Sequence, residues 1–250
     1  MQNKINYIAG LVVIIAWTWF VPEASAQFFG GKGADPTEQL SKIFGSATAF
    51  SATAVMTMRD KNGKITATTE TEMAMLDGKV RSEMDLTKVR GSDAPEQSNE
   101  EKQLLAGLGI NRTVSIVRPD QKLVYMVFPN LNAYCAEPLQ GGSPTDAASA
   151  KIEKKELGKE TVDGHPCVKS LVTITTKNEK IEATVWEAMD LKNFPVKSQY
   201  SSKEGSVVAT FKNLKLDKPA AALFEPPAGA TKYKNAQELM QAEMLKNLKF

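Results

Sequence analysis

His165 and Cys167 are the residues whose types and spacing could carry out chemistry, because they lie two positions apart in residues 160–167, ETVDGHPC. A nucleophilic cysteine needs a nearby base and usually a third group that orients the base. His165 is the only histidine of the chain, so it would have to be that base. Asp163-Gly164, however, is a strong hairpin-turn pair, and turn formation explains the segment without a role for the imidazole. The pattern therefore argues against a Cys–His enzyme.

The two cysteines have two further interpretations, a metal site and a disulfide. A zinc site needs three or four ligands, and one histidine with two cysteines and no CxxC or HExxH spacing is a poor set. An even cysteine count in an exported chain favours pairing. We therefore predict a Cys135–Cys167 disulfide, which would close a loop of about 32 residues and contribute about 3–4 kcal/mol.

Paired carboxylates are the remaining catalytic candidates. Glu70 with Glu72, or Glu182 with Glu187, could resemble the two acids of a glycosidase. Both pairs lie on expected strands, where acidic residues are usually solvated surface. We expect no catalytic residue, no metal and no cofactor, and hence a protein that is not an enzyme.

The first 26 residues have the layout of a secretory signal peptide. Lys4 precedes an apolar core of about 15 residues, shorter than the roughly 20 that span a bilayer as a helix. Small residues at the −3 and −1 positions predict cleavage after Ala26, and an uncleaved anchor is the alternative. The mature protein is expected to be soluble and outside the cytoplasm. Residues 27–34 are expected to be a flexible lead-in.

The charge of the chain argues against nucleic-acid binding. The formal net charge is +2, with 26 lysines and only five arginines, whereas nucleic-acid surfaces show a strong basic excess rich in arginine.

Residues 35–250 have a length suited to one domain with one sizeable core. We expect a monomer.

Antiparallel strands are expected to dominate this domain, because apolar and polar residues alternate with period two. In residues 50–86, Asn-Gly and Asp-Gly turns join three strands into a meander. Residues 89–111 are predicted to be a long connection, either a lid or a plain loop, with a short helix. Capping boxes and apolar periodicity predict helices at residues 35–45, 100–108, 143–157 and 235–248.

The apolar side of the alternating strands is unusually rich in methionine, a flexible side chain that suits adaptable binding surfaces. It has two interpretations, the wall of a ligand cavity or an ordinary core beneath the terminal helices. The cavity candidates are Met56, Met58, Met73, Met75, Val80, Met84, Leu86, Val185 and Phe211.

Two stretches resemble a known family. RPDQKLVYMVFPNLNAYC (118–135) and DLKNFPVKSQYSSKEGSVVATFKNLKLDKPAAALFEPPAGA (190–230) are similar to the LolA-like lipoprotein carriers and the outer-membrane lipoprotein-sorting proteins. The resemblance implies a mainly β (α+β) fold, in which a strongly curved antiparallel sheet, an unclosed barrel, wraps over a few helices.

The same resemblance implies a periplasmic, non-enzymatic carrier or chaperone. Its ligand would be a lipid or the acyl chain of a lipoprotein, held in a hydrophobic cavity under the sheet, with peripheral membrane contact. The alternative is an envelope interaction or sensor module whose core is packed and whose partner is a protein.

Overall fold

The computed structural model describes residues 47–91, 99–139, 151–175, 180–203 and 205–247. The predicted signal peptide, its cleavage site at Ala26, the lead-in and the helix at residues 35–45 lie outside the described residues and remain predictions.

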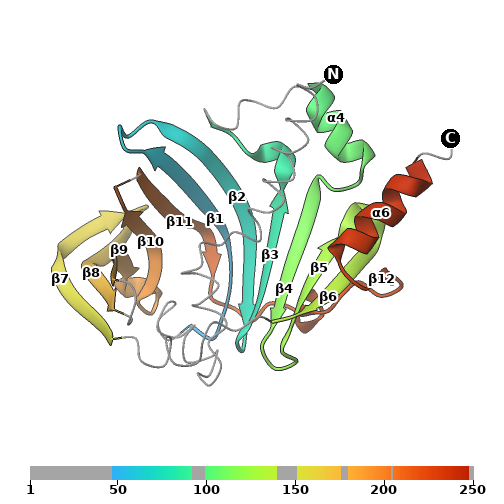
Figure 1. Ribbon diagram of the computed structural model, residues 1–250. Coiled ribbons are helices and arrows are strands. Elements are labelled where there is room, and N and C mark those ends of the chain that lie inside the picture. The colour runs from blue at the N-terminus through green and yellow to red at the C-terminus, as the bar shows by residue number, and fades with distance from the viewer. Residues whose placement is uncertain (1–46, 92–98, 140–150, 176–179, 204, 248–250) are drawn as a thin grey trace.

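Twelve strands form one sheet in the order β12-β6-β5-β4-β3-β2-β1-β11-β10-β9-β8-β7. Neighbouring strands run antiparallel, except that β12 runs parallel to β6. The sheet is strongly curved and its two end strands do not pair, which confirms the predicted mainly β, unclosed architecture (Figure 1). The strands are β1 (Ala49–Asp60), β2 (Ile65–Leu76), β3 (Lys79–Asp85), β4 (Arg112–Arg118), β5 (Leu123–Phe128), β6 (Ala133–Pro138), β7 (Lys151–Val162), β8 (His165–Thr175), β9 (Lys180–Ala188), β10 (Phe194–Ser201), β11 (Gly205–Lys215) and β12 (Thr231–Tyr233).

Tight turns with the expected residues join consecutive strands. Asp77 and Gly78 both have positive φ, at 48° and 82°, as do Asp163 and Gly164 at 47° and 85°. Adjacent positive φ values are what a two-residue hairpin of the mirror-image type requires, and Asp-Gly supplies them at low cost. The predicted β1–β2–β3 meander and the β7–β8 hairpin are therefore confirmed.

Two α-helices and four short 3-10 helices complete the described fold. The predicted helix after residue 100 is confirmed, as is the carboxy-terminal helix. They are α4 (Asn99–Gly107), α6 (Ala236–Asn247), η1 (Leu86–Lys88), η2 (Pro129–Leu131), η3 (Met189–Leu191) and η4 (Ala221–Phe224).

The helix predicted at residues 143–157 is wrong from residue 151 onward. Residues 151–162 form β7, which pairs along its length with β8. β7 is an end strand of the sheet, and its lysine and glutamate side chains from residue 153 onward are exposed. Charged residues at an exposed edge strand resemble the polar face of a helix, and pairing with β8 outweighed that local preference.

Candidate ligand-binding face

One face of the sheet carries the methionines that the sequence singled out. Side chains at opposed positions of neighbouring strands point to the same side, so register shows which residues share a face. Met56 on β1 pairs with Ala209 on β11, Ala209 with Ser198 on β10, and Ser198 with Val185 on β9. Met56 and Val185 therefore lie in one row across four strands. We call this side of the sheet the methionine face.

The nine candidates do not behave alike on this face. Met75, Val80 and Leu86 are buried core residues, at 2%, 6% and 3% exposure. Met73 and Phe211 pack at the margin of the cluster that contains Met75 and Val80, and Met84 packs against a second cluster with Leu86. The remaining three, Met56, Met58 and Val185, are half-buried and belong to neither cluster.

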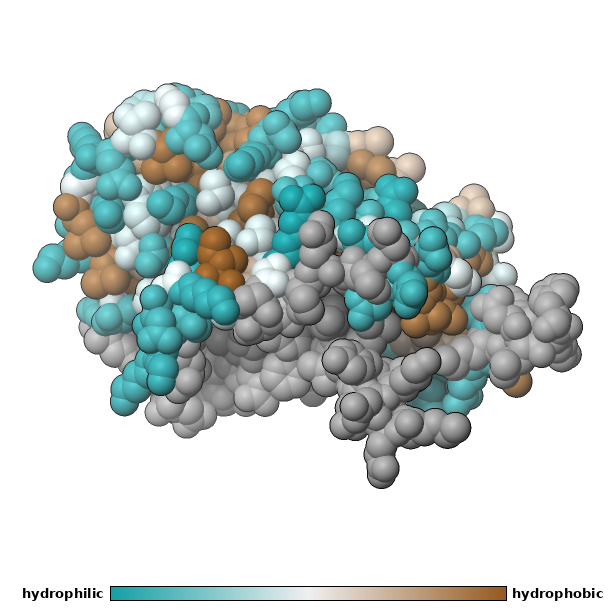
Figure 2. All heavy atoms as spheres, turned by 90° about the horizontal axis from the view of Figure 1, so that it is seen from above, coloured by the Kyte–Doolittle hydropathy of each residue, from teal (hydrophilic) through white to brown (hydrophobic). Residues whose placement is uncertain are grey.

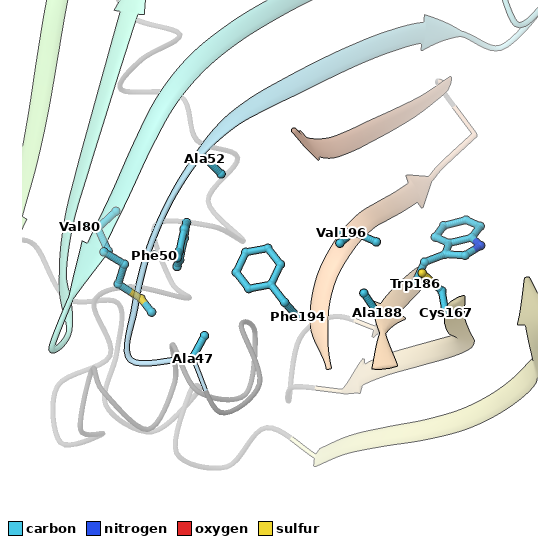
Figure 3. Packing of buried hydrophobic residues seen from close by; sticks show 10 residues of the cluster. Ala47, Phe50, Ala52, Val80, Cys167, Trp186, Ala188, Phe194 and Val196 are labelled. Atoms are coloured by element: carbon cyan, nitrogen blue, oxygen red, sulfur yellow. The ribbon is translucent and has the colours of Figure 1, made fainter. Parts of the chain in front are cut away.

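Three aromatic rings close the first cluster on this face. The centroids of Phe50 and Phe194 lie 5.0 Å apart, and those of Phe194 and Phe211 lie 5.4 Å apart, both edge to face. Figure 3 shows Phe50 and Phe194 pointing toward each other from β1 and β10. The Phe50–Phe194 contact joins two strands that are not neighbours in the sheet, since β11 lies between β1 and β10.

Helices cover the second cluster. Leu105 of α4 and Leu239 of α6 are buried against Met126, Phe128 and Cys135 of the sheet. The interpretation of the methionine face as a helix-covered core is therefore correct for this part of the sheet. The row that contains Met56 is the part that remains open to a ligand-binding interpretation.

Ser170 is a feature of the face that the sequence did not signal. It pairs with Val185 and so extends the row of Met56 onto β8. Its hydroxyl is fully buried, and within the described part of the chain it is the one buried side-chain polar atom without a hydrogen-bond partner. Nothing in the surrounding residues KSLVT distinguishes this serine from a surface serine.

The His165–Cys167 segment does not form a nucleophile–base pair. The imidazole Nδ1 lies 2.8 Å from Oδ2 of Asp190, while the Cys167 thiol donates to the backbone oxygen of His165 at 3.3 Å. Burial, helped by the charges of Asp190 and Glu160, raises the pKa of the Cys167 thiol above its usual value. A neutral thiol turned toward a carbonyl is not an activated nucleophile.

The predicted Cys135–Cys167 disulfide is wrong, since both thiols are free and fully buried. Cys135 lies on β6 in the cluster beneath α6, whereas Cys167 lies on β8 in the cluster of Phe50. Eight strands stand between β6 and β8 in the order of the sheet. An even cysteine count could not reveal that the two strands occupy opposite parts of the sheet.

The candidate carboxylate pairs are engaged elsewhere. Glu72 accepts hydrogen bonds from the Thr53 hydroxyl at 3.0 and 3.2 Å, and Glu187 forms an ion pair with Lys154. Among the described residues, no group of three or more histidine, cysteine or acidic side chains is placed to hold a metal ion. None of the described helices is long and apolar enough to cross a membrane.

A separate pocket of about 340 Å³ lies on the opposite face of the sheet, between β3–β5 and η4. Glu83 bridges Arg81, at 2.7 Å, and Arg112 at its mouth. Burial works against the ionised form of Glu83, but the two arginines outweigh it and hold the pKa of this carboxyl below its usual value. Glu83 is thus neutralised by its neighbours, and the network of two arginines and one carboxylate keeps a net charge of +1 at the pocket wall.

No protein-family model matches the chain, and no curated protein matches its sequence. The chain is, however, similar to several solved structures. The Mycobacterium tuberculosis lipoprotein LppX is 13% identical with a TM-score of 0.39, over 74% of this chain and 93% of LppX. MucB is 18% identical with a TM-score of 0.38, over 81% of this chain and 66% of MucB.

A LolA superfamily protein from Nitrosomonas europaea is a further similar structure. It is 9% identical with a TM-score of 0.29, over 76% of this chain and 96% of that protein. Similarity at this level indicates no ligand, and the fold assignment rests on strand order and register.

Proposed function

We propose that this protein is a non-enzymatic carrier or chaperone of the bacterial envelope, and that it binds a lipid or the acyl chain of a lipoprotein on its methionine face. The proposal is carried by one observation. The row of Met56, Ala209, Ser198 and Val185, apolar except for Ser198, continues past the packed clusters and stays half-buried.

The side-chain types in this row suit an apolar ligand of variable shape. Met56 and Met58 are unbranched and adapt to irregular contacts, and alanine at 209 leaves room beside them. On β8 the row reaches the unsatisfied hydroxyl of Ser170, where a polar group of a ligand would gain a hydrogen bond, and on β7 it continues to the exposed Glu156. The sequence motifs shared with LolA-like carriers support the same ligand class, and export through the predicted signal peptide supports an envelope location.

Native mass spectrometry on the exported protein, purified without detergent, tests the proposal. We expect the protein to carry, or to accept from added phospholipid, a mass of lipid size. Met56→Lys should abolish that adduct, because a charge in an apolar site excludes an acyl chain.

Val55→Lys is the matched control, since Val55 is also half-buried but points to the opposite face of β1. Loss of the adduct in both variants, with unchanged folding, would place the ligand elsewhere. A protein that never takes up lipid, yet binds a protein partner saturably, would favour the envelope interaction module.

A further inference from the structure

Three chain segments meet at one end of the sheet, the upper end in Figure 1. They are the β1–β2 turn (59–65), the chain after η1 (88–91) and the end of β10 (200–203). The backbone N–H of Arg90 donates to the carbonyl of Thr68 at 3.0 Å, which holds the second segment against the start of β2.

Gly205 holds the third segment against β1. It has φ of +153° and pairs with Asp60, and a Cβ at this position would lie 2.0 Å from the carbonyl oxygen of Arg59. Only glycine permits such a close approach of two backbones. The turn that carries Lys203 is therefore fixed beside the β1–β2 turn.

The three segments concentrate positive charge. They contain six basic side chains and a single carboxylate, that of Asp60, and Glu204, which lies outside the described residues, brings the formal charge to +4. The whole chain carries +2, so the remainder of the chain sums to −2. The basic side chains, which we call the basic rim, are Arg59, Lys61, Lys64, Lys88, Arg90 and Lys203.

These cations are available to a partner. Lys61, Lys64 and Lys203 are exposed, and none of them has an ion-pair partner within the described part of the chain. The carboxylate of Asp60 is already engaged by the backbone N–H groups of Asn62 and Lys64, at 2.8 and 2.9 Å. Excess charge of one sign on one end of a molecule orients it toward an oppositely charged surface.

Two large apolar side chains lie among the cations. Ile65 and Tyr200 are each 40% exposed. Seen from above in Figure 2, this end of the molecule shows hydrophobic side chains scattered among hydrophilic ones. Tyrosine is favoured where an apolar layer meets water, as at the headgroups of a membrane.

Tyr200 also links this end to the methionine face. It pairs with Val207, which pairs with Met58. We propose that the basic rim docks the protein on an anionic lipid bilayer, with Tyr200 and Ile65 at the level of the headgroups. Bilayer chemistry fits better than an acidic protein because the cations surround apolar side chains that lead to an apolar face.

Vesicle flotation of the exported protein, with its amino terminus verified by mass, tests this proposal without any acyl ligand. We expect binding to vesicles of equal parts phosphatidylcholine and phosphatidylglycerol and none to pure phosphatidylcholine. Each rim lysine should contribute about fivefold to partitioning, so Lys61→Gln/Lys64→Gln/Lys203→Gln should weaken it about 100-fold.

The control is Lys122→Gln/Lys215→Gln/Lys218→Gln, which removes the same charge from exposed lysines outside the three segments. We expect less than about a twofold change for this variant, because its lysines lie beyond a Debye length from the docked surface. Equal losses in both variants, or equal binding to neutral vesicles, would overturn the proposal. Binding to an acidic polypeptide but not to anionic vesicles would overturn it in favour of a protein partner. Neither result depends on whether the methionine face carries lipid.

Discussion

Phe50 and Phe194 meet edge to face with ring centroids 5.0 Å apart, although β11 separates their strands in the sheet. Both rings are fully buried. Phe211 on the intervening strand completes the group, 6.4 Å from Phe50. The three rings join β1, β10 and β11 at the point where the sheet turns away from the meander.

Phe194→Ala should lower the free energy of unfolding by about 3–5 kcal/mol, because it removes a fully buried ring and leaves a cavity between β1 and β10. Urea denaturation followed by circular dichroism measures this. Tyr200→Ala, on the same strand but 40% exposed, should cost less than about 1 kcal/mol. Similar costs for the two variants would show that the ring contact is not part of the core.

The burial of the two free thiols determines how they should react with an alkylating reagent. Both cysteines should resist iodoacetamide in the folded protein and react fully in urea, without prior reduction, because each is buried and neither is oxidised. Intact mass after alkylation counts the modified thiols. If the unfolded protein takes up label only after reduction, the two cysteines are joined by the disulfide that the sequence predicted.

The buried Cys135 thiol should also make the free energy of unfolding depend on pH. Burial, with a smaller effect of Glu137, raises the pKa of the Cys135 thiol from 9.0 to about 11. The unfolded chain ionises at the lower pH, so the stability from the neutral thiol is complete below pH 9 and is lost as pH rises toward 11. Across that window the wild type should lose about 2 kcal/mol more than Cys135→Ala. Urea midpoints at pH 8 and 10.5 would measure the difference, and parallel losses in the two proteins would contradict it.

The β1–β2–β3 meander is the part of the fold that the sequence predicts most completely. Alternation in 50–86 and two turn pairs were sufficient to place β1, β2 and β3 and to put their methionines on one face. Register across β11, β10 and β9 then confirms Phe211 and Val185 on the same face, which alternation within each strand could not establish alone.

Tertiary arrangement accounts for what could not be predicted. Residues 151–157 have a helix-compatible pattern, and only the presence of β8 makes them a strand. Cys135 and Cys167 are only 32 residues apart in sequence, but the order of the sheet places eight strands between β6 and β8, which carry them. The division of the methionine face into buried and half-buried parts depends on where α4, α6 and the rings of Phe50, Phe194 and Phe211 pack, which no local pattern specifies.

Arg118 should be a strong stability determinant on the opposite face. Its guanidinium, with a side chain 6% exposed, donates to Asp120 at 2.8 and 2.9 Å, to the Phe224 carbonyl at 3.1 Å and to Glu225. Arg118→Ala should cost about 1–3 kcal/mol, because it leaves the buried Phe224 carbonyl without a donor, whereas the half-exposed carboxylates of Asp120 and Glu225 can be solvated.

Urea denaturation gives this cost, and limited proteolysis should show new cleavage near η4. Arg112→Ala is the control, since its side chain is 54% exposed and should contribute less than about 1 kcal/mol. Resistance of η4 to protease in Arg118→Ala would show that Phe224 alone holds the segment.

Ser170→Ala separates a structural from a ligand-binding role for the row that contains Met56. The buried hydroxyl has no partner, so its removal should leave the free energy of unfolding unchanged or raise it by up to about 1 kcal/mol. If a polar group of a bound lipid supplies the missing hydrogen bond, the same variant should bind that lipid about tenfold more weakly. Titration with a fluorescent fatty acid measures the affinity, and urea denaturation measures the free energy of unfolding.

Ser198→Ala is the control, because Ser198 lies in the same row but is half-buried. It should change neither the affinity nor the free energy of unfolding by much. Unchanged affinity in Ser170→Ala would place the polar end of the ligand elsewhere on the face, and a large loss of stability would mean that the hydroxyl has a structural partner.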